Sequence, residues 1–389
     1  MKKKLVSGII AAIMAALLAC HYTSHHVSSL YDLVPPYIRD SVYLDSTNIF
    51  STEKAALGRY LFYDRRLSVN KTRACASCHA PEFSFTDGYD RSIGALGDLH
   101  QRNSRPLINL IFNRYLTSAD SSIHFPEQQM NGPMMNDHPV EMGMKGNEAS
   151  ILRRLKDDEF YSSEFASVFG NGSDPFSINN IRDAIACFVK TILSFNSPYD
   201  RFSFQQQKDA LNESQKRGMQ LFFSTKLNCN SCHGGFNFST PSIRDDHSNA
   251  LFYFNTGLYN LDTVGSYPSS DQGLYALTGR NEDRGKFRVP TLRNLAFTAP
   301  YFHDGSARSL EDVIKVYDEG GRYIDHGALA GDGRINPFKD PSIRELSLNP
   351  EERRDLAAFL LSLSDSSICN NPLYANPFKE DETRPHHGK

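Results

Sequence analysis

The residues with the clearest chemical capacity form two copies of one five-residue pattern, at Cys75, Cys78 and His79 and again at Cys229, Cys232 and His233. Two cysteines three positions apart, followed directly by a histidine, are the attachment signature of haem c. One helical turn places both sulfurs on one side of the backbone, where they can add to the vinyl groups of a haem, and the histidine then ligates the iron. A pair of zinc knuckles is the alternative interpretation, but zinc does not need a histidine directly after each CxxC pair.

Similar helix patterns precede both copies and would position them. Residues 51–66 predict a helix that begins at the N-cap Ser51 and buries a stripe of Leu57, Leu61 and Phe62. Gly58 inside this helix costs about 1 kcal/mol relative to alanine, so we expect it to permit close packing. Before the second copy, Gly218 is followed by Leu221 and Phe222 in the same order, in a helix opened by Asn212 and Glu213. This weak repeat predicts a mainly helical fold with two cytochrome-c-like domains, each carrying one covalently attached haem c, joined by long loops.

Other patterns divide the chain. An apolar stripe over residues 181–195 predicts a helix, and Asn349-Pro350 begins another, which buries Leu356, Phe359, Leu360 and Leu363. A boundary near residue 200 follows from Ser197-Pro198 and the polar run after it. The predicted order is a signal peptide of the lipoprotein type (1–19), a tether (20–45), an N-terminal haem domain (46–200), a C-terminal haem domain (201–365) and a tail (366–389) that ends near a solvated His386-His387 pair.

Composition excludes some classes of protein and places the chain. Its 389 residues are 40% hydrophobic and carry a net charge of −3, so neither nucleic acid nor an anionic membrane surface is favoured as a partner. Basic Met1–Lys4, an apolar run and Cys20 describe a secretory signal with a lipobox, and a signal cut elsewhere is the alternative. We therefore expect a periplasmic protein with a lipid anchor at Cys20. Cys187 and Cys369 are left over, either as a disulfide or as two free thiols.

Longer motifs around both haem signatures resemble those of the bacterial dihaem cytochrome c peroxidases and their MauG-type relatives. The similarity covers about residues 46–365 and includes Ser92-Ile93-Gly94, Arg102-Asn103, Gly132-Pro133, Pro139-Val140-Glu141-Met142-Gly143, Val289-Pro290-Thr291-Leu292-Arg293-Asn294 and the run from Thr298 to Gly305. The resemblance implies a peroxidatic haem at the first signature (haem 1), an electron-accepting haem at the second (haem 2), and one Ca²⁺ between the domains.

Peroxide reduction needs an open position on one iron and a base that moves a proton from the near to the far peroxide oxygen. By resemblance this base is Glu141, although a glutamate in a surface turn is the alternative. Gln129 corresponds to a partner glutamine of the family. Two extra residues separate Pro133 from Glu141 here, so Gln128 is an alternate.

The chain departs from the family at haem 1. Many relatives have, after Ser-Ile-Gly, a histidine that caps haem 1 until the enzyme is reduced, and here that position is Ala95. A methyl group cannot coordinate iron, so we predict an open haem 1 in the fully oxidised protein, without reductive activation. His100 is the alternative ligand.

Two further departures concern haem 2. The usual methionine ligand position, fourteen residues after His303, is Tyr317, as in the MauG-type branch, and the last methionine of the chain is Met219. A tyrosine ligand would stabilise the oxidised iron; an ordinary core tyrosine is the alternative. The tryptophan that relatives place between the haems corresponds to Ala119, and the chain has no tryptophan, so electrons must take another route.

Other site residues follow from the resemblance alone. Asn103 would give Ca²⁺ a side-chain oxygen, while Thr298 and Pro300 would give backbone carbonyls. Arg293 is expected either to bind a haem propionate or to form a structural salt bridge.

The leading functional hypothesis is a cytochrome-c peroxidase-type oxidoreductase that reduces hydrogen peroxide to water with electrons from a small cytochrome c or cupredoxin. One alternative is a MauG-type oxidase that modifies a protein substrate through a high-valent dihaem state, which Tyr317 favours. Another is a plain dihaem electron carrier, against which Glu141 and Ala95 argue. The family resemblance also suggests a homodimer.

Overall fold

The computed structural model describes residues 29–42, 48–170, 174–239 and 252–378. The predicted signal peptide, Cys20 and the His386-His387 pair lie outside these residues. Within them no helix is both long and apolar enough to span a bilayer. The helices are α2 (Thr52–Tyr63), α3 (Pro126–Gln129), α4 (Asn131–Met135), α5 (Glu148–Lys156), α6 (Glu159–Phe169), α7 (Ile178–Lys190), α8 (Pro198–Phe204), α9 (Glu213–Phe223), α10 (Tyr275–Thr278), α11 (Leu310–Asp318) and α12 (Pro350–Leu361).

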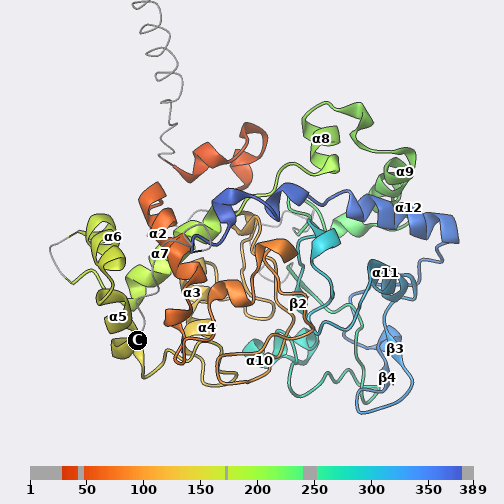
Figure 1. The fold of residues 1–389 in the computed structure, drawn as a ribbon. Helices are drawn as coiled ribbons and strands as arrows, with labels where there is room; N and C mark the ends of the chain where they lie inside the picture. The colour runs from red at the N-terminus through yellow and green to blue at the C-terminus, as the bar shows by residue number, and fades with distance from the viewer. Residues whose placement is uncertain (1–28, 43–47, 171–173, 240–251, 379–389) are drawn as a thin grey trace, which may run out of the picture.

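Strands are few and short, so the fold is mainly helical, as predicted. β1 (Tyr253–Phe254) pairs antiparallel with β2 (Phe287–Arg288), and β3 (Tyr323–Ile324) pairs antiparallel with β4 (Gly331–Asp332). Long loops connect the helices, and Figure 1 shows that these loops fill much of the space between the helical pairs.

The first half of the molecule is built on α2 crossing α7, at the left of Figure 1. The Ser51 hydroxyl caps α2 by accepting the N–H of Lys54 at 3.1 Å. A Cβ atom at Gly58 would lie only 1.9 Å from the carbonyl oxygen of Ala184 on α7. The expectation that this glycine permits close packing is therefore confirmed.

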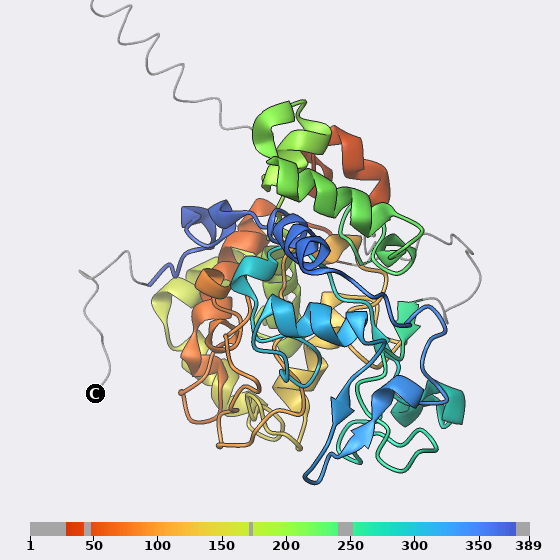
Figure 2. The same ribbon diagram turned by 90° about the vertical axis from the view of Figure 1, so that its right-hand side faces the viewer.

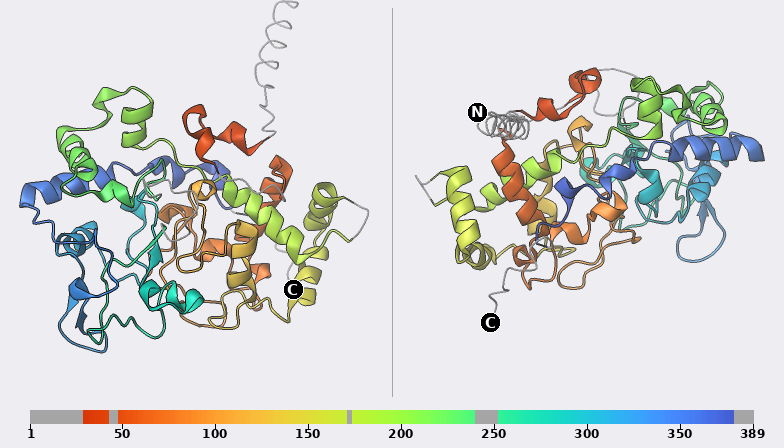
Figure 3. Two further views of the ribbon diagram at one scale, coloured as in Figure 1. Left: turned by 180° about the vertical axis from the view of Figure 1, so that it is seen from behind. Right: turned by 45° about the horizontal axis from the view of Figure 1, so that its top comes forward.

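The second half repeats this arrangement with α9 crossing α12, as both views in Figure 3 show. Asn212 caps α9 by accepting the N–H of Gln215. A Cβ atom at Gly218 would lie 1.8 Å from the carbonyl oxygen of Asp355 on α12. The weak sequence repeat is thus a structural repeat, in which a glycine lets the helix before each CxxCH pattern touch a second helix.

Each helical pair has its own hydrophobic core. The first core contains the predicted residues of α2 and α7, among them Leu57, Leu61, Phe62, Ile181 and Ile185. The second contains Phe222, Leu356, Phe359, Leu360 and Leu363. The predicted helix over 181–195 ends earlier, at Lys190, and Ser197-Pro198 starts α8, where the Ser197 hydroxyl caps the new helix.

Parts of the predicted tether and tail pack against the first core, so these expectations are wrong for the described segments. Leu30, Val34 and Ile38, spaced four residues apart, are buried in it. Tyr37 stacks on Phe204 of α8 with ring centroids 4.7 Å apart, and Figure 2 shows this N-terminal segment beside α8. The C-terminal segment crosses back from α12 to α2 (Figure 1), because buried apolar side chains anchor it there, namely Ile368 and Tyr374.

Candidate haem sites

Each CxxCH pattern folds into one tight turn between the helical pair and the loops. The turns are the 3₁₀ helices Cys75–Ser77 and Cys229–Ser231. In each, the histidine N–H donates to the carbonyl of the first cysteine, at 3.0 Å for His79 and 2.9 Å for His233. The same backbone path at two places far apart in the chain confirms that the motif is a repeated structural unit. Among the described residues, no group of three or more His, Cys, Asp or Glu side chains is arranged to hold a metal ion, as a zinc knuckle would require.

The two histidine rings are oriented by matching hydrogen bonds. Nδ1 of His79 lies 2.8 Å from the carbonyl oxygen of Phe85, and Nδ1 of His233 lies 3.0 Å from that of Phe238. A carbonyl oxygen only accepts, so Nδ1 carries the proton in both rings and Nε2 keeps its lone pair for a metal. Burial lowers the pKa of His233 to about 4, which keeps this imidazole neutral and able to ligate.

The second turn lies in the wall of a cavity of about 270 Å³. Cys229, Cys232 and His233 line it together with many apolar side chains, including Val289, Leu295, Leu310, Ile314 and Leu356. An apolar cavity with two thiols and a neutral imidazole on its wall fits a covalently attached haem, because a porphyrin presents apolar faces and needs one axial nitrogen.

Tyr317 lines this same cavity from α11. Among the described residues its hydroxyl has no hydrogen-bond partner, so it is free to meet a metal. Burial first, and then the nearby Cys232 and Cys229 thiols, raise the pKa of Tyr317 far above its usual range. In the holoprotein these thiols would be uncharged thioethers, so only the burial effect would persist. The structure brings together the two residues predicted to ligate haem 2, although their ligation itself stays a prediction.

At the first turn, Glu141 lies near both cysteines: burial is the main cause that raises the pKa of the Cys75 and Cys78 thiols, and the charge of Glu141 raises both further. The Glu141 loop is held in place by backbone bonds, because the N–H of Ala95 donates to the Glu141 carbonyl at 2.7 Å and that of Met142 to Pro133 at 2.9 Å. Burial alone raises the pKa of the Glu141 carboxyl from 4.5 to about 7. A carboxylate with this pKa can both take and return a proton near neutral pH.

His100, the alternative ligand, faces the proposed base. Its Nε2 lies 3.7 Å from Oε2 of Glu141 and is buried without a hydrogen-bond partner in the described part of the chain. Burial, and next the charge of His79, lower the pKa of His100. No sequence motif places His100 beside Glu141. The Ile93–Leu99 bridge folds residues 93–99 into a hairpin, and Ala95 in this hairpin bonds the Glu141 backbone, so His100 comes to lie next to Glu141.

The two candidate glutamines differ in surroundings. Oε1 of the exposed Gln128 accepts the N–H of His124 at 3.2 Å, whereas the half-buried Gln129 ends α3.

The two alanines at positions where the chain departs from the family, Ala95 and Ala119, are both buried, with 8% and 6% of their surface exposed.

The expected calcium residues lie around one cavity. Asn103, Thr298 and Pro300 all line the cavity of the second turn. The Asn103 amide nitrogen donates to the Tyr89 carbonyl at 2.8 Å, which leaves its side-chain oxygen available.

Arg293 forms the structural salt bridge that was one of its two expected roles. It is fully buried, and its two terminal nitrogens each lie 2.9 Å from an oxygen of Asp200. Its Nε donates to the carbonyl of Phe236 at 3.0 Å. Arg105 and Arg288, which line the cavity, were not predicted from the sequence, because they belong to no motif that indicates a haem contact.

The two remaining described cysteines are free thiols and have different neighbours. Cys187 is buried and lies 3.8 Å from Oδ1 of Asn48. Burial raises the pKa of Cys369, whose thiol also contacts the backbone of Ser84. The free-thiol alternative is therefore the one observed.

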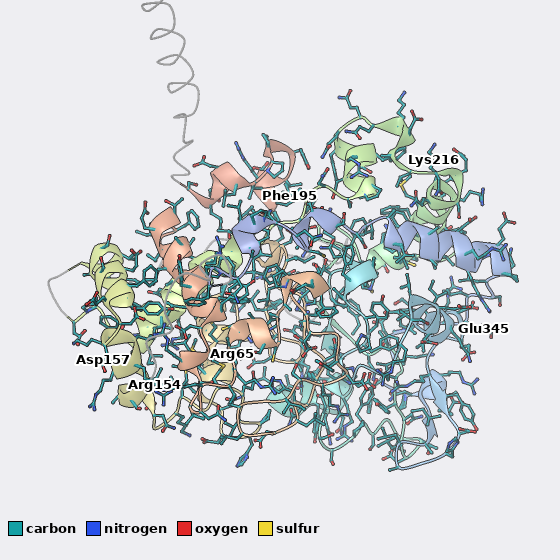
Figure 4. All side chains as sticks on the ribbon, viewed as in Figure 1. Arg65, Arg154, Asp157, Phe195, Lys216 and Glu345 are labelled. Atoms are coloured by element: carbon teal, nitrogen blue, oxygen red, sulfur yellow. The ribbon has the colours of Figure 1, made fainter. Side chains whose placement is uncertain are left out.

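An aromatic cluster connects the first core with the segment that follows the second turn. Phe195, labelled in Figure 4, has its ring 6.1 Å from that of Phe112 and 5.6 Å from that of Phe236, measured between centroids. Phe112 belongs to the first core, and Phe236 follows His233 by three residues.

A helical fold with two CxxCH turns, each with an oriented histidine, defines a dihaem c-type cytochrome. Comparison with known proteins narrows this class. Residues 52–209 match the family model described as di-haem cytochrome c peroxidase. The cytochrome-c peroxidase IdrP1 of Pseudomonas sp. (strain SCT) is 33% identical over 341 residues, which cover 83% of this chain and 84% of the relative. The chain therefore belongs to the dihaem cytochrome c peroxidase family and is a peroxidase-type oxidoreductase.

Two further relatives are MauG-like. The methylamine utilization protein MauG of Methylorubrum extorquens is 29% identical over 324 residues, which cover 83% of this chain and 82% of the relative. A solved structure, that of a MauG-like protein associated with microbial copper homeostasis, is 40% identical and aligns with a TM-score of 0.83. The alignment covers 89% of this chain and 97% of that protein.

Proposed function

We propose that this protein reduces hydrogen peroxide at haem 1, with Glu141 as the base and haem 2 as the entry point for electrons. The observation that carries the proposal is a half-buried carboxyl beside the first CxxCH turn, 3.7 Å from Nε2 of His100, whose pKa partial burial raises to about 7. Haem c bound at each turn would supply an iron that exchanges electrons with the oxidant and the donor. The electrons would come from a small periplasmic cytochrome c or cupredoxin.

The residues of the chain have separate tasks in this reaction. Glu141 would take a proton from the near oxygen of peroxide and return it to the far oxygen, so that water leaves. Its neighbour His100 would hold or supply a proton across the 3.7 Å that separates them. Ala95 offers no donor atom, so the haem-1 iron would stay open to peroxide in the oxidised protein. Gln129 is proposed as a partner to Glu141 at this site.

Further parts of the proposal concern the surroundings of the haems. His79 would ligate iron 1, while His233 and Tyr317 would ligate iron 2. One Ca²⁺ held by Asn103, Thr298 and Pro300 would join the two halves. We also propose export to the periplasm with a lipid anchor at Cys20, and assembly as a homodimer.

A second candidate function is the MauG-type oxidation of a side chain on a protein substrate, with peroxide as the oxidant. Tyr317 in the haem-2 cavity favours it, and so does the 40% identity with a MauG-like protein. In both candidates peroxide removes two electrons and ends as water, and the candidates differ only in which protein gives up those electrons.

The test is a visible spectrum of the oxidised holoprotein before and after one equivalent of peroxide, followed by turnover with a reduced small c-type cytochrome. Rapid cytochrome oxidation supports the peroxidase. A fast spectral change with slow cytochrome oxidation supports the MauG-type candidate. No spectral change with peroxide refutes both and leaves a plain electron carrier. Two low-spin haems in the oxidised protein would contradict the open haem 1.

A further inference from the structure

Three arginines line the haem-2 cavity, and the two that are enclosed have no carboxylate partner among the described residues. Arg105 and Arg288 both reach its wall, and neither forms an ion pair with a carboxylate among the described residues. Three other enclosed arginines do have such partners, namely Arg102 with Asp271, Arg293 with Asp200 and Arg322 with Asp304, whereas Arg154 donates to backbone carbonyls instead. A buried cation costs several kcal/mol unless an anion compensates it. Two guanidinium groups without a carboxylate partner on the wall of one apolar cavity therefore point to an anion that binds there.

Both arginines converge on Ser118, which also lines the cavity. Nη1 of Arg105 donates to the Ser118 hydroxyl at 3.1 Å, and the backbone N–H of Arg288 donates to the Ser118 carbonyl at 2.8 Å. Arg288 has 8% of its surface exposed, and its Nε is buried without a hydrogen-bond partner. Burial lowers the pKa of Arg105 only to about 10, so its guanidinium stays charged at neutral pH. Both side chains thus keep N–H donors for a carboxylate.

We propose that Arg105 and Arg288 bind the propionate carboxylates of haem 2. The inference rests on the proposed attachment of that haem at the second CxxCH turn. A guanidinium matches a carboxylate in shape and charge and can donate two parallel hydrogen bonds to it. Two carboxylates on an otherwise apolar porphyrin would neutralise both cations where the protein provides no acid.

Arg105 directly follows a residue that contacts the first haem site. The hydroxyl of the preceding residue, Ser104, lies 3.4 Å from Nδ1 of His79 and donates to the Cys78 carbonyl at 2.6 Å. These two consecutive residues thus contact the first turn, through Ser104, and both line the haem-2 cavity.

The test uses the purified holoprotein and the variant Arg105→Gln. Loss of a positive charge next to haem 2 favours the oxidised iron, so the midpoint potential of haem 2 should shift to more negative values in spectroelectrochemistry. Arg344→Gln is the matched control, because Arg344 also lines the cavity but is exposed and donates to the backbone carbonyl of Lys226 at 3.1 Å. Water screens this charge, so the control should shift the potential less.

The covalent haem content distinguishes a failure of the proposed function from a failure of the arginine proposal alone. Wild-type protein with fewer than two haems per chain refutes the proposed function. Two haems per chain, with an Arg105→Gln shift no larger than that of Arg344→Gln, refutes the arginine proposal alone. If Arg105→Gln does not accumulate, Arg105→Lys carries the test, since it keeps the charge and loses the planar fork. The propionate methylene proton resonances of haem 2 should then move in NMR spectra, and unchanged resonances would overturn the proposal.

Discussion

The pH dependence of the peroxide reaction should follow the protonation of Glu141. Its carboxyl must be ionised to act as a base, and burial raises its pKa to about 7. At pH 5 roughly 1% of the groups would be ionised, against about 90% at pH 8. The bimolecular rate constant for peroxide should therefore fall roughly hundredfold between pH 8 and pH 5. With an ordinary glutamate pKa the same change would be less than about twofold.

Glu141→Gln removes the base and should remove this pH dependence. General acid–base catalysis contributes roughly 10²- to 10⁴-fold, so we expect a loss of that size at pH 8 and a flat profile below it. Stopped-flow mixing of the oxidised holoprotein with peroxide measures the rate constant directly. Asp137→Asn is the control, because it makes the same chemical change at an exposed carboxylate that pairs with Lys145 in the same loop.

Glu141→Gln should lower the peroxide rate constant but raise the stability of the folded protein at pH 8. A folded-state pKa of about 7 for Glu141, against an ordinary 4.5, means that its stability contribution is full below pH 4.5 and is lost as pH rises through 7. At pH 8 the ionised Glu141 lowers the free energy of unfolding by roughly 3 kcal/mol, and a glutamine, which does not ionise, has no such effect. Glu141→Gln should thus resist denaturant better than wild type at pH 8 but not at pH 4.5. A wild-type rate that does not vary between pH 5 and pH 8, or a variant with wild-type rate, would refute the reasoning.

Three other predictions follow from single contacts. Tyr317→Phe should alter the visible spectrum of the low-spin haem and leave the peroxide rate constant of haem 1 within a small factor; an unchanged spectrum would mean an ordinary core tyrosine. Gly58→Ala places a methyl 1.9 Å from a carbonyl oxygen of α7 and should cost roughly 1–3 kcal/mol or more, whereas Gly132→Ala, with its nearest atom at 3.8 Å, should cost far less in the same thermal-unfolding comparison. Asp200→Asn leaves the fully buried Arg293 without its anion and should lower the free energy of unfolding by roughly 3–5 kcal/mol in a denaturant titration, and a loss below about 1 kcal/mol would contradict the buried ion pair.

Local features of the chain were predictable from the sequence. The N-caps Ser51, Asn212 and Asn349 act within the next three residues, and each forms the expected hydrogen bond. The CxxCH turns are equally local, because one turn of backbone brings both sulfurs and the histidine together. Gly58 and Gly218 marked the helix crossings, since a glycine inside a good helix implies something close to it.

Contacts between distant segments were decided by the tertiary structure. Nothing in the sequence pairs Arg293 with Asp200, or directs Arg105 into the cavity of the second turn. The pKa of Glu141 likewise depends on burial by surrounding loops, which no motif encodes. The sequence predicted a tether and a tail for the short apolar segments near both ends of the described chain, because three or four apolar residues are too few to show a helical period. The sequence by itself determined where a haem could be attached, because covalent attachment uses neighbouring residues. Only the tertiary structure decided which charges surround that haem, because charges act through space across segments that meet by packing.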